Sequence, residues 1–178
     1  LAHNLSRIKR YLPPNCEILA VVKANAYGHG AVEIARALTC QGIERFAVAS
    51  LDEGIALRQA GLSTSIVVLG ALFEKQVSDL VAHRLTPVVS DGRILPALAK
   101  AARSHPTPYP IHLKVETGMG RLGFSPEELL TLLDNPLLHS SLQVEGMMTH
   151  LADADGKDST VTERQLGDFR AVLEQIRQ

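Results

Sequence analysis

The sequence contains no tryptophan, and its aromatic content is only 4%. This scarcity argues against the aromatic platforms on which proteins that bind single-stranded nucleic acid stack the bases. The net charge of -1 provides no broad basic surface that would attract nucleic acid or an anionic membrane. No apolar run approaches the roughly 20 residues that a membrane-spanning helix needs. We therefore expect neither a nucleic-acid partner nor a membrane.

Cysteine is also scarce, with Cys16 and Cys40 as the two examples in the chain. Neither has the spacing of a metal-ligand motif, and two cysteines do not make a disulfide scaffold. This usage predicts a reduced, cytoplasmic compartment. The first residues form an amphipathic pattern that begins without Met and does not look like a signal peptide, so we expect a trimmed N-terminus.

Short apolar runs alternate with amphipathic segments along the whole chain. The apolar runs predict six strands, at about residues 18–22, 45–50, 65–70, 85–90, 109–116 and 143–150. Helices are expected before, between and after them, the last from Ser159 to Gln178. Two of these helices have strong N-terminal signals, because Ser50 precedes Glu53 and Ser125 precedes Glu128 in capping-box spacing. The alternation predicts an α/β fold with a parallel sheet and right-handed crossovers.

Two architectures fit this order of elements, a doubly wound open sheet and part of an eight-stranded (β/α) barrel. Polar residues occur at the carboxyl ends of several strands, namely Lys23, Ser50, Ser90, Thr117 and His150. A barrel gathers its chemistry on that rim, whereas an open sheet gathers it mostly at one switch point. A complete barrel typically needs about 250 residues. We therefore favour an incomplete (β/α)8 TIM-type barrel, with about six βα units present.

The stretch from Ile18 to Gly30 organises the chain and reads ILAVVKANAYGHG. Its apolar run predicts a strand buried on both faces, and Lys23 follows at the strand end. A polar, glycine-bearing turn then leads into a helix, where α/β proteins commonly bind anions. A lysine in this place can form a Schiff base with the aldehyde of pyridoxal phosphate, while the turn receives the phosphate. For a lone strand-end lysine, a side chain that simply reaches solvent is the simpler interpretation.

A second stretch, from His112 to Phe124, reads HLKVETGMGRLGF. Its glycines formally match the dinucleotide fingerprint GxGxxG. We disfavour that interpretation because the predicted helix begins at Ser125, after the glycines and not inside the loop. Arg121, in this glycine turn, is better suited to hold a cofactor phenolic oxygen or a substrate carboxylate by charge-assisted hydrogen bonds.

A third stretch, VEGMMTHLADAD, ends a predicted strand at His150. A lone histidine in such a place is more often structural than catalytic. The following acidic residues do not fit a calcium loop, because Lys157 and Arg164 fall at ligand positions. We expect a solvated acidic loop there and no metal site.

Together the three stretches resemble alanine racemases. AVVKANAYGHG matches the cofactor-lysine motif of that family over about eleven consecutive residues. HLKVETGMGRLGF also looks like the family, and the third stretch is similar to its strand ending in Thr-His-Phe-Ala, although Leu151 replaces the usual Phe. The resemblance extends from the first predicted helix to the last.

This resemblance implies an enzyme that uses pyridoxal 5'-phosphate to interconvert L-alanine and D-alanine, in bacteria a source of D-alanine for cell-wall peptidoglycan. It implies that Lys23 carries the cofactor as an internal aldimine and serves as one of two bases. Tyr27 would reach the phosphate, Arg121 the cofactor or the substrate, and His150 the side of the pyridine ring. Lys114 matches a position that is often N-carboxylated and orients the arginine. An ion pair of Lys114 with Glu116 or another carboxylate is the alternative.

The resemblance also implies that residues 1–178 are part of a larger protein. In the family, the second base is a tyrosine from a C-terminal β domain, contributed by the other subunit of a homodimer. We expect that domain to be absent from this sequence, and the fragment to be inactive alone. A racemase for serine, for lysine or of broad specificity would share these motifs. A non-catalytic pyridoxal-phosphate protein of the single-barrel type is a further alternative, although such proteins lack the YGHG and TGMGRLG stretches.

Overall fold

The computed structural model of the protein describes residues 1–177 and divides the chain into two compact units. Unit 1 comprises Leu1–Gly70 and Asp79–Thr86, and unit 2 comprises Ala71–Ser78 and Pro87–Gln178. Both units have the strand and helix alternation predicted from the sequence. Within residues 1–177, no helix combines the length and the apolar character that crossing a membrane would require.

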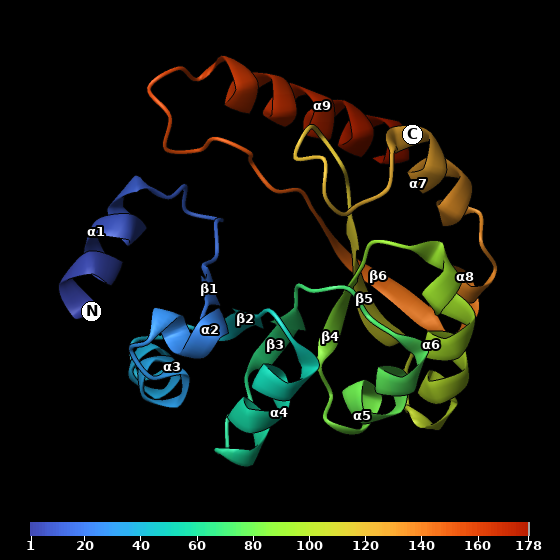
Figure 1. Cartoon of the computed structure of the whole chain (residues 1–178), viewed down its shortest axis with the longest axis horizontal. Helices are drawn as coiled ribbons and strands as arrows, with labels where there is room; N and C mark the ends of the chain where they lie inside the picture. The colour runs from blue at the N-terminus through green and yellow to red at the C-terminus, as the bar shows by residue number, and fades with distance from the viewer. Residues whose placement is uncertain (178) are drawn as a thin grey trace. The chain divides into compact units, whose positions relative to one another are not determined.

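Unit 1 contains three parallel strands, with β1 (Leu19–Val21) paired to β2 (Arg45–Val48) and β2 paired to β3 (Ser65–Val68). Its helical elements are α1 (Ala2–Tyr11), α2 (Lys23–Tyr27), α3 (Ala31–Thr39) and α4 (Leu51–Gln59). Figure 1 shows the three strands in chain order. Phe46, Leu57 and Ile66 are fully buried and form the centre of this unit's core.

Two elements are shared between the units, α5 (Val77–Ala82) and β4 (Thr86–Val89). Unit 2 contains β5 (Tyr109–Lys114) and β6 (Leu142–Met148), and β5 pairs in parallel with both β4 and β6. Its helices are α6 (Leu95–Ala101), α7 (Pro126–Leu133), α8 (Leu137–Ser140) and α9 (Thr160–Arg177). Short 3₁₀ turns occupy Glu74–Gln76, Gly92–Ile94 and Ala102–Ser104.

Capping residues and prolines explain where several helices begin and end. The capping boxes predicted at Ser50 and Ser125 are both formed and start α4 and α7. Pro126 occupies the first turn of α7, where its missing N–H has no cost. At the other end of the chain, α1 stops before Pro13, because a residue that precedes proline is held in the extended region.

The six predicted strands and their parallel pairing are confirmed, and most strands are one or two residues shorter than expected. One prediction about β1 is wrong, because the strand is not buried on both faces. Val21 is 42% exposed, and Leu19 and Ala20 are only partly covered. The physical reason is that β1 is an outer strand with β2 as its partner in unit 1. Helix α8 was not predicted, and the last predicted residue of α9, Gln178, lies outside the described residues.

Candidate functional site

The residues that follow β1 form a left-handed turn beginning at Lys23. Ala24, Asn25, Ala26 and Tyr27 have φ values between 51° and 54°. This conformation costs roughly 1–2 kcal/mol for each residue that has a Cβ atom, and consecutive examples are rare. Backbone strain of this kind persists only where surrounding structure enforces it, and it concentrates at functional sites. The turn was expected from the sequence, but its handedness was not.

Lys23 and Tyr27 occupy the two ends of this turn. The Lys23 side chain is half-buried, whereas Tyr27 is 64% exposed, so its phenol is available to a ligand. Asn25 closes the turn onto α3, because its Oδ1 accepts a hydrogen bond of 2.8 Å from the backbone N–H of Ala31. The structure therefore places both predicted residues of the first stretch on one short, internally bonded segment.

Glu53, in the first turn of α4, bonds to this segment from outside it. One carboxylate oxygen, Oε1, accepts the backbone N–H of Ala24 at 2.7 Å. The other, Oε2, accepts the N–H of Ala49 at 2.7 Å and that of Ser50 at 3.2 Å. Hydrogen bonds to a charged group contribute about 1.5–3 kcal/mol each, which offsets part of the strain in the turn. The capping-box spacing predicts Glu53 as a helix-capping residue, but no sequence signal indicates its bond to the residue after Lys23.

In unit 2, the loop that follows β5 is organised around the carboxylate of Glu116. Its two oxygens accept the backbone N–H groups of Gly118 at 2.6 Å and of Arg121 at 3.1 Å. Partial burial by itself raises the pKa of Glu116, but backbone donors from Gly118 to Arg121 outweigh it and hold the pKa below its usual value.

Gly123, in this loop, occupies a position where no larger residue fits. Its φ is +136°, and a Cβ atom added there would lie 2.7 Å from the backbone nitrogen of Glu116. The loop amides that a dinucleotide fingerprint would present to a phosphate are directed at Glu116 instead. In addition, α7 begins at Pro126, beyond the loop, as the sequence indicated. Both findings argue against a dinucleotide site.

The other candidate residues of unit 2 lie at the carboxyl ends of β5 and β6. Lys114 is buried, with 7% of its surface exposed, and is in register with Met148 of β6. Thr117 and Thr149 follow the two strands and share a hydrogen bond of 2.7 Å between their hydroxyl groups. His150 is exposed just beyond.

Gln165, on α9, holds these strand ends together. It is fully buried, and its side-chain amide donates to the hydroxyl of Thr117 at 3.2 Å and to the carbonyl of His150 at 3.0 Å. Its carbonyl oxygen accepts the N–H of Ala152 at 2.8 Å. The red helix α9 runs past this loop region in Figure 1. Lys114, Arg121 and His150 therefore belong to one connected end of unit 2. The part played by Gln165 was not predicted from the sequence.

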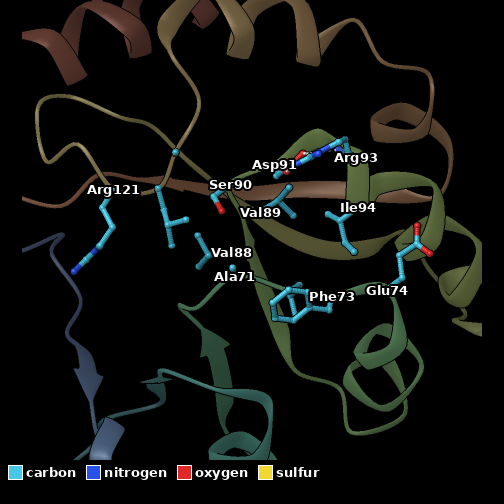
Figure 2. Close-up of a pocket in the computed structure, with 13 residues that line it drawn as sticks. Ala71, Phe73, Glu74, Val88, Val89, Ser90, Asp91, Arg93, Ile94 and Arg121 are labelled. Atoms are coloured by element: carbon cyan, nitrogen blue, oxygen red, sulfur yellow. Dashed lines mark hydrogen bonds and ion pairs between the residues drawn. The ribbon is translucent and has the colours of Figure 1, made fainter.

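A cavity of about 500 Å³ adjoins the loop that carries Arg121. Its walls come from residues 71–74, 88–91, 93–94 and 121–123, all in unit 2, and include the apolar side chains of Phe73, Val89 and Ile94. This volume lies in the range of small-molecule sites. Figure 2 shows that the side chain of Arg121 points away from the Asp91–Arg93 ion pair, which is therefore not its partner.

The acidic residues after His150 do not gather around a common centre. Asp158 instead accepts the backbone N–H of Thr160, the first residue of α9, at 2.9 Å. Within residues 1–177, no group of three or more His, Cys, Asp or Glu side chains is arranged to hold a metal ion.

Comparison with known proteins identifies the chain's relatives. The family model described as alanine racemase, N-terminal domain, matches residues 1–178. The alanine racemase of Carboxydothermus hydrogenoformans is 40% identical over 177 residues, covering 99% of this chain and 48% of that protein. The structure of alanine racemase from E. faecalis superimposes with a TM-score of 0.89 at 40% identity, over 97% of this chain and 47% of that one. The structure of a histidine racemase from Leuconostoc mesenteroides subsp. sake superimposes with a TM-score of 0.85 at 31% identity, over 94% of this chain and 45% of that one.

These matches decide between the two architectures left open by the sequence. The fold is that of the N-terminal TIM-type barrel domain of these relatives, and the barrel is incomplete within this chain. The chain spans about half the length of the relatives that it matches.

Proposed function

We propose, starting from the fact that this chain belongs to the alanine racemase family, that it is the cofactor-binding part of an enzyme that interconverts L-alanine and D-alanine. The observation that carries the proposal is the strained left-handed turn that starts at Lys23. Such a turn is costly, and of its four left-handed residues only Ala26 is buried. Its natural explanation is that it presents a lysine and a tyrosine to a ligand.

The residues present suit pyridoxal 5'-phosphate. Lys23 offers an amine for the aldehyde, and the exposed phenol of Tyr27 can donate a hydrogen bond to the phosphate. Arg121, exposed on its glycine loop, can hold an anionic oxygen of the cofactor or the carboxylate of the substrate, and we place His150 beside the pyridine ring. When bound, pyridoxal phosphate supplies an electron sink that stabilises the negative charge left when the α-proton is removed.

Lys23 has a second task in this proposal, which is to remove the α-proton from one face of the substrate in one direction of the reaction and to donate a proton to that face in the reverse direction. A base for the opposite face is not found among the three tyrosines of this chain. Tyr27 is assigned to the phosphate, Tyr11 lies on α1 and is 78% exposed, and Tyr109 is buried at the start of β5. We propose that a C-terminal β domain provides this base from the partner subunit of a homodimer. Residues 1–178 alone should therefore bind cofactor poorly and show no racemisation of L-alanine.

Lys114 is proposed to be N-carboxylated. It is buried at the end of β5, immediately before the loop that carries Arg121. A lysine cation there would repel the guanidinium, whereas a carbamate would accept its hydrogen bonds and fix its direction. Carbon-13 NMR of the protein exchanged with labelled bicarbonate should show a carbamate signal that Lys114→Ala removes. A carbamate-free spectrum would leave the ion-pair alternative for Lys114.

The principal test is reduction of the full-length protein with borohydride in the presence of pyridoxal phosphate, followed by peptide mapping. The label should lie on the peptide that contains Lys23, and Lys23→Ala should abolish both the label and α-proton exchange. Labelling of Lys114 or of another lysine would overturn the assignment.

A second candidate is a racemase for a different amino acid, and the similarity to a histidine racemase supports it. Racemisation rates over a panel that contains alanine, serine, lysine and histidine decide between the two. We further propose a bacterial, cytoplasmic enzyme that supplies D-alanine for peptidoglycan. The free, exposed state of Cys16 and Cys40 supports the compartment.

A further inference from the structure

Glu53 does more than cap its helix, because its carboxylate joins two backbone segments that are distant in sequence. One oxygen binds the N–H of Ala24, which is the residue after Lys23. The other binds the N–H groups of Ala49 and Ser50, at the end of β2. We propose that Glu53 is a positioning residue for Lys23, an inference that rests on the cofactor role proposed for that lysine.

The bond to Ala24 acts directly on the direction of the lysine. The N–H of Ala24 belongs to the peptide unit whose carbonyl is that of Lys23, so a fixed N–H fixes the ψ angle of Lys23. This bond also stands at the entrance to the residues with positive φ, from Ala24 to Tyr27. Without it, the strained segment loses its tie to α4 and is free to relax toward right-handed or extended conformations.

A second capping box in the same chain shows what is particular to Glu53. Ser125 and Glu128 form the same reciprocal pair at the start of α7, with bonds of 3.2 Å and 2.8 Å. Glu128 receives the N–H of Ser125, whereas Glu53 receives in addition the N–H groups of Ala49 and Ala24. The additional contacts of Glu53 are the ones that reach the end of β2 and the lysine turn.

The two boxes respond differently to the same isosteric change. Glutamine replaces glutamate in ordinary capping boxes, since one acceptor oxygen is enough. Glu53 uses both oxygens on separate donors, so in Glu53→Gln the amide NH₂ must face a backbone N–H on one side. Glu128→Gln is therefore a matched control that keeps its box intact.

The experiment uses the full-length protein in four forms: wild type, Glu53→Gln, Glu128→Gln and Ser50→Ala. Ser50→Ala removes the hydroxyl that accepts the Glu53 N–H at 3.3 Å, so it weakens the start of α4 without touching the bond to Ala24. Hydrogen exchange of the cofactor-free protein is measured on peptides that cover residues 22–31. Pyridoxal phosphate is then titrated by absorption, below the thermal midpoint of the least stable variant.

Glu53→Gln should accelerate exchange over residues 24–31 and weaken cofactor binding by about tenfold to a hundredfold, the effect of one lost charged hydrogen bond. It should also move the pH midpoint of the absorption of the Lys23-bound cofactor. Glu128→Gln should leave these three quantities at wild-type values. Ser50→Ala should lower the thermal midpoint and leave cofactor affinity within about twofold of wild type.

The outcomes separate this inference from the proposed function. Cofactor affinity in Glu53→Gln equal to that in Glu128→Gln, with Lys23 labelled in the wild type, would overturn the role of Glu53 alone. A wild-type protein that takes no pyridoxal phosphate on Lys23 would overturn the proposed function itself. If Glu53→Gln does not fold, the hydrogen-exchange rate of the Ala24 amide in the wild type tests the inference instead. Ala24 is exposed, so only its bond to Glu53 would slow the exchange of its N–H. Unprotected exchange at Ala24 would overturn the role of Glu53.

Discussion

The turn after β1 and the loop after β5 solve the same problem in opposite ways. Each follows a parallel strand, carries a proposed cofactor or substrate contact, and is held by a glutamate that accepts backbone N–H groups. The loop in unit 2 uses Gly118, Gly120 and Gly123 wherever φ is positive. The turn in unit 1 instead carries side chains at four successive positions of positive φ.

The difference shows what each segment must provide. The unit 2 loop needs close backbone approach, because a Cβ atom on Gly123 would collide with Val115 and Glu116. The unit 1 turn needs side chains, since Asn25 closes it onto Ala31 and Tyr27 is the proposed phosphate contact. Strain is therefore accepted at Asn25 and Tyr27, where a side chain is required, and avoided in the unit 2 loop, where only the backbone matters.

Gly123→Ala should have the largest effect on stability. At this position the new Cβ would lie 2.7 Å from the nitrogen of Glu116, and the backbone φ is +136°. We expect a loss of about 3 kcal/mol or more, from overlap and backbone strain together. Urea unfolding of the full-length protein measures it, with Gly61→Ala as the control. Gly61 has φ of +89° but open space around it, so its loss should be about 1–2 kcal/mol. An equal loss of stability in Gly123→Ala and Gly61→Ala would show that the loop moves to make room for the new Cβ atom.

Arg121→Lys should have the next largest effect and should appear in catalysis. Lysine keeps the charge but lacks the planar fork of arginine, so it cannot make two parallel bonds to an anionic oxygen pair. We expect kcat/KM for alanine to fall by about tenfold to a hundredfold, while borohydride still labels Lys23. Wild-type kinetics in this variant would mean that Arg121 is a surface residue without a role at the site.

Acid should weaken the glycine loop through Glu116. Its pKa in the folded protein lies below the ordinary value of 4.5, so the contribution of its carboxylate is complete above that value. As the pH falls from about 5 through the folded pKa, the carboxylate gains a proton and the stabilisation is lost. Glu116→Gln should be less stable than wild type near neutral pH, and the difference should shrink in acid. A difference that is constant between about pH 6 and 3 would contradict this assignment.

Ala24→Gly should have the smallest effect and the opposite sign. Glycine removes roughly 1–2 kcal/mol of left-handed strain at this exposed position but costs about 0.5–1 kcal/mol in chain entropy. We expect a net gain of about 0 to 1.5 kcal/mol in the free energy of unfolding, measured by thermal or urea denaturation. Ala37→Gly, on α3 in a right-handed helix, is the control and should be destabilising by about 1 kcal/mol. A marked loss in Ala24→Gly would show that the turn is not strained in solution.

Much of the fold followed from the sequence because its signals are local. Apolar runs and their spacing located the strands, and Ser50 and Ser125 with their glutamates located two helix starts. Helix α8 was missed because its four residues are too short to show a period. The prediction for β1 was wrong because an apolar run predicts a strand but does not show whether other elements cover both of its faces.

The site was predicted less completely, for a different reason. The motifs identified Lys23, Tyr27, Lys114, Arg121 and His150, and their roles stay predictions until the cofactor is tested. The residues that hold them could not be read from local patterns. Glu53 already had a sufficient local explanation as a cap, and Gln165 contacts Thr117 over 48 positions of sequence. The left-handed turn had no signal, because Ala-Asn-Ala-Tyr contains no glycine.

The bond between Ala24 and Glu53 also dictates an order of events during folding. It spans 29 residues, and the conformation that it secures is one that the isolated segment would not populate. The lysine turn can therefore take its final form only after α4 has packed against β2 and β3. By then the entropy cost of closing the chain between Ala24 and Glu53 has already been met. The proposed cofactor lysine is thus set late in the assembly of unit 1. Capture of pyridoxal phosphate would then draw on the folded population alone and shift the folding equilibrium toward it.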